Sequence, residues 1–352
     1  MLDTFPESGA RNQLCFALRA LGRHEQALSI GREAIRFNRN ESFPVANTAF
    51  SYLYLNRPLE AQAILDEARF HNPNEILPDV AYAVAFVRHD RFAMQQYLTW
   101  AMGKAGDENA LLSQQASAET YYGHLGKARE LWQRAVESAS RDGALETAAG
   151  WRASEALGEA EFGYPARARK LGSESLALSH GPNVEALAAL VFARAGDTVQ
   201  AKRLAEKLNR DFPRDTLIQS YDLPVIRASI EIQKGHPRNA VEILKATAEY
   251  DLAVPALLPN VFSPYVRGQA YAQAKQWQLG AFEFQTVLDH PGLVNYSLNG
   301  ATARLLLGRA QAMMGDKAAA RKSYQDFLTL WKDADPDIPI YKRAIAEYAR
   351  LQ

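Results

Sequence analysis

The chain has 352 residues, of which 40 are Lys or Arg and 40 are Asp or Glu, so its formal net charge is zero. A balanced charge without basic blocks argues against electrostatic binding to nucleic acid or to an anionic membrane. The longest apolar runs, 80–87 and 186–193, are far shorter than the roughly 20 residues that a bilayer span requires, so we expect no membrane insertion by this chain.

The first seven residues carry neither the basic residues nor the apolar run of a secretory signal, so a cytoplasmic location is the default expectation. The single cysteine, Cys15, leaves no partner for an intrachain disulfide. Cys15 also falls at a position where the repeat described below requires a small side chain. We therefore interpret it as a packing residue.

Pairs of helical patterns separated by short turns recur along the whole chain, as in a solenoid of stacked hairpins. Successive turns are 34, 33, 34, 40, 33, 39, 40 and 40 residues apart. We expect hairpins one to four at about 8–140 and hairpins five to nine at about 148–332. The nine turn residues are Gly22, Asn56, His89, Gly123, Gly163, Gly196, Gly235, Lys275 and Gly315.

Small residues recur at two fixed offsets from these turns. Seven positions before the turn, every residue except Tyr82 is Cys, Ala or Gly. Five positions after it, Met94 is the only large residue, and the small ones are Ala27, Ala61, Ala128, Ala168, Ala201, Ala240, Gly280 and Ala320. Small side chains at both offsets allow the two helices of a hairpin to cross closely.

The turn residues are those that tolerate a left-handed backbone at a helix end. Asn56 is the usual substitute for glycine there. His89 and Lys275 fit this role less well, so we expect differently shaped turns in hairpins three and eight. Four histidines lie at or near the turns of separate repeats, where we expect solvated side chains rather than metal ligands: His24, His89, His124 and His236.

Two segments interrupt the helical pattern near the C-terminus. Three prolines within 251–264 predict an extended linker between hairpins seven and eight. A polar break at 333–339 precedes an apolar stripe at helical spacing, which predicts a capping helix at about 338–351. The stripe consists of Tyr341, Ala344, Ile345, Tyr348 and Leu351.

The 34-residue period and the small crossing residues resemble the tetratricopeptide (TPR) repeat. Particular words also resemble the TPR tail of bacterial, acidobacterial-type serine/threonine protein kinases. These words are AFSYLYLNR (49–57), ARELWQRAVESA (128–139), YVRGQAY (265–271), FQTVLDHPG (284–292) and YQDFLTLWKDADPDIPI (324–340). The resemblance implies a sensory or scaffolding partner of a kinase, and similar tails follow winged-helix DNA-binding domains in related regulators.

The chain itself carries no kinase machinery. Phosphoryl transfer requires a glycine-rich loop, a strand lysine, a His-Arg-Asp loop and an Asp-Phe-Gly metal ligand, and the sequence contains none of them. No His-Glu-x-x-His or Cys-x-x-Cys pair supplies metal ligands either. We therefore predict a non-enzyme with no catalytic residue, no bound metal and no cofactor.

In a TPR array the first helices of the hairpins line a concave groove, and the residue two before each turn tends to face it. Five of the nine residues in this register are our candidate groove residues, namely Tyr54, Tyr121, Arg194, Gln233 and Gln273. Because no ladder of Lys, Arg and Asn runs through successive repeats, the groove does not resemble the TPR clamp for acidic tails. An alternative interpretation is that the two tyrosines pack between helices.

Together these features predict an all-α, TPR-like α-solenoid that forms a single superhelix over 1–352. Its expected function is that of a protein-interaction scaffold or sensor in bacterial signalling, binding an extended peptide or a partner helix in the groove. The alternative is a regulatory part of a serine/threonine kinase, or of a winged-helix regulator, whose catalytic or DNA-binding domain is not in this chain.

Overall fold

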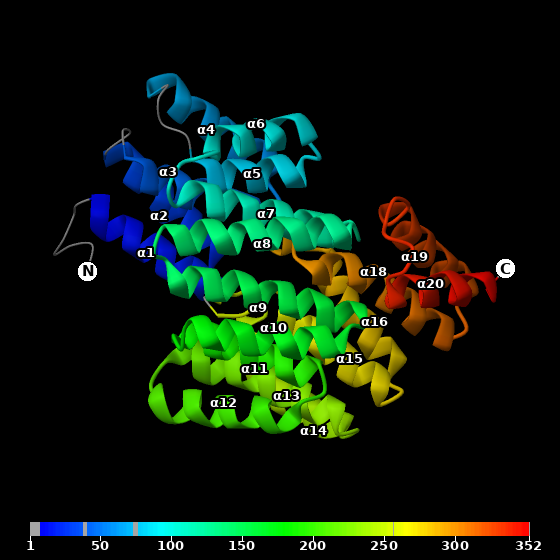
Figure 1. The fold of residues 1–352 in the computed structure, drawn as a ribbon. Coiled ribbons are helices and arrows are strands. Elements are labelled where there is room, and N and C mark those ends of the chain that lie inside the picture. Colours follow the sequence, from blue (N-terminus) through cyan, green and yellow to red (C-terminus); the bar gives the residue numbers. More distant parts are fainter. Residues whose placement is uncertain (1–7, 38–40, 73–76, 256, 352) are drawn as a thin grey trace.

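The computed structural model describes residues 8–37, 41–72, 77–255 and 257–351. Within these ranges twenty α-helices follow one another and no strand occurs, and 79% of the described residues are helical. The predicted all-α, TPR-like solenoid with a C-terminal capping helix is therefore confirmed. Figure 1 shows the hairpins stacked from α1 to α14, after which the chain returns through α15, α16 and α18.

The described helices pair into nine hairpins. The first helices of the hairpins are α1 (Ser8–Ala20), α3 (Ser42–Tyr54), α5 (Pro78–Val87), α7 (Asp107–Tyr121), α9 (Leu145–Phe162), α11 (Pro182–Arg194), α13 (Leu223–Gln233), α15 (Phe262–Gln273) and α18 (Leu298–Met313). The second helices are α2 (His24–Phe37), α4 (Pro58–His71), α6 (Arg91–Ala101), α8 (Leu125–Arg141), α10 (Pro165–Leu178), α12 (Thr198–Asp211), α14 (Pro237–Leu244), α16 (Trp277–Leu288) and α19 (Lys317–Leu330).

Four shorter or terminal elements complete the fold. A π-helix precedes α13, a 3₁₀ helix follows α14, the four-residue α17 separates hairpins eight and nine, and α20 ends the chain. Their bounds are η1 (Ile218–Asp222), η2 (Lys245–Tyr250), α17 (Pro291–Val294) and α20 (Pro339–Ala349). Residues 251–255 and 257–261 between η2 and α15 form no helix.

All nine turns share one backbone shape. Asn56, His89 and Lys275 have φ angles of 57°, 58° and 61°, in the same left-handed region as the six turn glycines. In each case the next N–H reaches back to a carbonyl five residues earlier, as in Asp90 to Ala85. The expectation of differently shaped turns in hairpins three and eight is therefore wrong, because this hydrogen-bond pattern stabilises the left-handed conformation even with a Cβ present.

The helix crossings are close where small residues recur. Each of the seven alanines five residues after a turn is fully buried. A Cβ added to Gly280 would lie 3.1 Å from the carbonyl oxygen of Gly268 on the facing helix. A Cβ on Gly308 would lie 3.0 Å from the ring of Tyr324. Backbone and ring contacts at these distances leave no room for larger side chains.

The capping helix α20 packs on α19 through part of the predicted stripe. Ala344 and Ile340 are buried, and Glu347 accepts hydrogen bonds from Arg309 and from the hydroxyl of Tyr324. Ile345, by contrast, is 47% exposed. Ile345 therefore lies outside the packed face, and Ile340, five residues earlier, is the buried isoleucine of α20 instead.

The second half of the chain packs against the hairpin turns of the first half. Beside the first turn, His24 Nε2 donates to the carbonyl oxygen of Leu252 at 2.7 Å. Beside the second turn, Asn56 donates to the carbonyl of Asp289 at 2.8 Å and accepts from the N–H of Gly292 at 3.0 Å. Segments more than 200 residues apart are thereby joined.

The same packing continues at the fourth and fifth turns. The N–H of Asp335 donates to the carbonyl of Gly123 at 3.0 Å, and the indole of Trp331 donates to the carbonyl of Tyr121 at 2.9 Å. A Cβ on Gly163 would lie 3.0 Å from Pro339. The turns of hairpins one, two, four and five thus meet 252–254, 289–292, 331–335 and 337–339 in order, and we call this the closing junction.

Between the two halves, α18 contacts α7 and α17 contacts α3. In Figure 1 the orange α18 lies behind the green part of the stack, where it contacts α7. The hydroxyl of Tyr265 on α15 donates to Glu161 on α9 at 2.9 Å and accepts from Thr302 on α18 at 3.0 Å. The concave side of the early hairpins is therefore largely filled by the chain itself.

Candidate functional site

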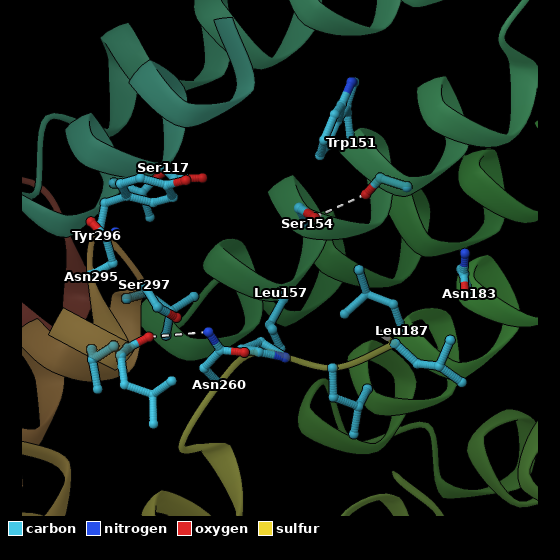
Figure 2. Close-up of a pocket in the computed structure, with 18 of the residues that line it drawn as sticks. Ser117, Trp151, Ser154, Leu157, Asn183, Leu187, Asn260, Asn295, Tyr296 and Ser297 are labelled. Carbon is cyan, nitrogen blue, oxygen red and sulfur yellow. Dashed lines mark hydrogen bonds between the residues drawn. The ribbon is translucent and has the colours of Figure 1, made fainter. Parts of the chain in front are cut away.

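A hollow with a cavity volume of about 390 Å³ lies on the concave side. Pairs of side chains three or four residues apart on the first helices form its wall, and 257–260 and 293–298 close it from the second half. The residues from helices are Phe50, Tyr54, Ser117, Thr120, Trp132, Gly150, Trp151, Ser154, Leu157, Asn183 and Leu187. Figure 2 shows these walls facing one another across the hollow, which we call the central pocket.

The central pocket carries no formal charge on any of its described lining residues, although 23% of the chain is charged. Five aromatic side chains contribute instead, and Trp132 and Trp151 lie with ring centroids 6.4 Å apart. Burial raises the pKa of Tyr54 and that of Tyr296, so both phenols stay neutral. Such a wall favours an uncharged, partly apolar ligand, because a buried charge would have no counter-charge.

Three hydroxyl groups on the helical wall of the pocket are already engaged as donors. Ser154 donates to the carbonyl of Gly150 at 2.9 Å, as Figure 2 shows. Ser117 and Thr120 likewise donate to carbonyls four residues earlier on α7. A serine or threonine hydroxyl has one proton but two lone pairs, so these oxygens are left as acceptors.

The closing side is held by amide side chains. Asn260 donates to the carbonyl of Leu293 at 3.1 Å, and Asn299 donates to the carbonyl of Asn260 at 3.1 Å. Asn295 has a left-handed φ of 53°, and its side-chain oxygen is buried with no hydrogen-bond partner in the described part of the chain. The side opposite the helices therefore contains one buried acceptor whose hydrogen-bonding capacity is unused.

The structure divides the five groove candidates. Tyr54 and Tyr121 are each 9% exposed. The ring of Tyr54 packs against His24 and Phe50, and the ring of Tyr121 packs against Phe86. Only Tyr54 lines the central pocket. The interpretation that both tyrosines pack between helices agrees with their burial. A ligand contact by either of them stays a prediction.

The other three candidates tie neighbouring first helices together. Arg194 pairs with Glu161 on the preceding hairpin, and its side chain is 9% exposed. Gln233 donates to the carbonyl of Arg194 at 3.5 Å, and Gln273 donates to that of Ile232 at 3.2 Å. Both glutamines are exposed, so they remain accessible at the far end of the stack.

Not all turn histidines are solvated. His24 is 5% exposed. Burial is the main cause that lowers its pKa, and the positive charge of the nearby Arg19 lowers it further. The expectation of a solvated side chain is wrong here because the second half of the chain covers the first turn. His124 and His236 pair with Glu119 and Glu231 on their own hairpins.

The described residues contain neither a metal site nor a membrane span. Across the described ranges, no group of three or more His, Cys, Asp and Glu side chains could hold a metal ion. None of the helices in those ranges combines the length and the apolar character needed to cross a bilayer.

Sequence reasoning missed the central pocket because it missed the closing of the solenoid. The signal was present in the apolar run at 80–87, whose residues on α5 are buried from Val80 to Phe86. An inner helix that lines an open, wet groove carries polar residues on that side, whereas a helix that is apolar all round is covered on all sides. The run at 186–193 on α11 carries the same signal.

No protein-family model matches the chain, and no curated protein matches it. Among solved structures, the chain resembles human IFIT1 in a dimer with PPP-AAAA at a TM-score of 0.52 and with m7Gppp-AAAA at 0.50. Sequence identity is 17% in both, and the alignments cover 99% and 98% of this chain and 82% and 81% of the IFIT1 chain. A tetratricopeptide repeat protein from Parabacteroides merdae aligns over 87% of this chain and 96% of its own at 13% identity and a TM-score of 0.44. At these identities the likeness concerns the fold alone.

Proposed function

We propose that this chain is a protein-interaction scaffold that holds an uncharged stretch of a partner protein at the central pocket. The observation that carries the proposal is a charge-free, aromatic hollow of about 390 Å³ on the concave side of a helical-repeat fold. Apolar pockets with a few convergent polar groups are the common form of ligand sites. Extended segments bind such surfaces through side chains placed in pockets.

The two RNA-bound IFIT1 structures raise RNA as a rival ligand. Phosphate recognition depends on Arg and Lys side chains, which neutralise the backbone charge. The described lining of the central pocket contains neither residue. We therefore favour a protein segment over an RNA end.

A displayed random-peptide library tests this proposal on the whole chain. Enriched peptides should lack charged residues in their central positions, and they should lose binding to a Leu187→Arg variant, which places a cation in the pocket. Val199→Arg is the matched control, because Val199 is 78% exposed on the outer helix α12. The proposal would be refuted if the peptides bound equally well to both variants. It would also be refuted if a triphosphate-capped AAAA oligonucleotide bound more tightly than any peptide.

The finer part of the proposal concerns context. The resemblance of the sequence words to kinase-associated TPR tails supports a role in bacterial signalling, in which the scaffold presents a partner to a serine/threonine kinase. A regulatory part of such a kinase, or of a winged-helix regulator, is the alternative. Co-expression of the chain with a kinase or regulator encoded beside it, followed by size-exclusion chromatography, tests both, and separate elution in every case contradicts both.

A further inference from the structure

The central pocket contains one glycine whose presence no packing contact explains. Gly150 lies within α9, four residues before Ser154 and seven before Leu157, on the stripe that faces the pocket. A Cβ added to Gly150 would meet no atom within 4 Å. Its φ angle is not in the left-handed region that requires glycine.

A glycine inside a helix lowers stability relative to alanine, because it loses more backbone freedom on folding. At several other described helix positions the glycine prevents a clash, as Gly268 does against Phe284 at 2.7 Å. At Gly150 the missing side chain prevents nothing and instead leaves free space. The consequence of glycine at this position is therefore the open volume of the pocket.

The chemistry around this volume restricts its occupant. Aromatic rings such as Trp132, Trp151 and Tyr54 favour a flat apolar group, with which they can stack or make edge contacts. No charged side chain among the described lining residues compensates an ionised group. On the helical wall, Ser117, Ser154 and Thr120 present acceptors, because each of these three hydroxyl protons is used within its own helix; the neutral phenols of Tyr54 and Tyr296 can donate as well as accept.

We infer that the pocket kept open by Gly150 receives one uncharged aromatic side chain that carries a hydrogen-bond donor, a tryptophan or a tyrosine of the bound segment. The inference rests on the proposed function, since the partner protein supplies the side chain. It adds the chemical class of the group, the acceptors that recognise it and the residue that makes room for it.

Isothermal titration of the whole chain with capped amino acids tests the inference without any peptide. N-acetyl-L-tryptophanamide should bind, and its 1-methylindole counterpart should bind at least about tenfold more weakly, since loss of the N–H leaves a buried acceptor unpaired. Tryptamine and indole-3-acetate, which carry a positive and a negative charge, should give no detectable heat. Equal affinity for the methylated or charged compounds would overturn the inference.

Two variants locate the binding. Gly150→Leu should abolish binding of the capped tryptophan and leave the thermal midpoint unchanged or raised, because leucine fills the free volume and favours helix. Gly9→Leu is the matched control, since an added Cβ at Gly9 also meets nothing within 4 Å and Gly9 lies on α1, outside the pocket. Undiminished binding by Gly150→Leu would overturn the inference.

The two proposals fail in different ways. Displayed peptides that bind through the pocket but contain neither tryptophan nor tyrosine would overturn the inference alone. If the capped tryptophan binds with the expected selectivity but the displayed library yields no enriched peptide, the scaffold function is overturned. The chemistry assigned to the pocket is then supported.

Discussion

Replacing Asn56 with glycine isolates the energy of the closing junction from that of the hairpin turn. Asn56 has φ 57°, which glycine adopts readily, so the Asn56→Gly change preserves the turn. It removes both side-chain contacts to the second half of the chain, the donation to the carbonyl of Asp289 and the acceptance from the N–H of Gly292.

Each of these hydrogen bonds contributes about 0.5 to 1.5 kcal/mol net, and the exposed position of Asn56 places them in the lower part of that range. Two opposing effects of glycine nearly cancel. Relief of the left-handed strain stabilises the turn, whereas the greater freedom of glycine in the unfolded chain destabilises it by about as much, roughly 1 kcal/mol. We therefore expect a loss of about 1 to 2 kcal/mol at the junction, or a factor of about 5 to 30 in its opening equilibrium.

Amide hydrogen exchange measures this opening directly. The N–H of Val254 donates to the carbonyl of Ala20 across the junction and keeps this acceptor in both variants, so it should exchange about 5 to 30 times faster in Asn56→Gly than in the wild-type chain. Lys275→Gly is the control, because Lys275 has the same turn geometry at φ 61° but belongs to hairpin eight, outside the junction. If both variants exchange at the wild-type rate, the closing junction does not hold the two halves together.

Three further predictions concern other parts of the chain. Ala201→Leu should destabilise by about 1 to 3 kcal/mol in urea unfolding, because Ala201 is fully buried at a helix crossing; an unchanged midpoint would contradict this. Asp222 is buried, and neither of its side-chain oxygens has a hydrogen-bond partner among the described residues. Burial raises its pKa from 3.8 to about 8, and the negative charge of Asp215 contributes to this rise. Because the native state keeps a proton that the unfolded state loses, stability should fall as pH rises from about 4 to about 8, and Asp222→Asn should remove that dependence. Purified chain should not incorporate phosphate from labelled ATP, and detectable incorporation would contradict the absence of kinase residues.

Much of the repeat architecture could be predicted from local sequence. The turn residues and the small crossing residues act within one hairpin, so fixed offsets were enough to find them. The turn shape at His89 and Lys275 could not be predicted from residue preference alone. Hydrogen bonds from the turn to the preceding helix, such as Asp90 to Ala85, outweigh the modest strain of a left-handed residue.

The central pocket could not be predicted in the same way, because it depends on contacts between distant segments. The register of the groove assumed an open concave side, whereas Val294 and Tyr296 of the second half occupy that side beside Phe86. Sequence offsets within a repeat carry no information about such contacts. The apolar runs on α5 and α11 were the one local feature that indicated additional cover.

The closing junction changes how this solenoid is expected to fold. In an open repeat array each unit contacts only its neighbours, so the ends fray independently and folding can start anywhere. Here hydrogen bonds join residues 228, 236 and 209 positions apart. Such contacts raise the contact order. The chain must lose the conformational entropy of a loop of this length before the contacts of the junction can form, which slows folding. We therefore expect hairpins eight and nine to dock slowly and late in folding. In the docked state, the two ends of the array should unfold together in a single cooperative step.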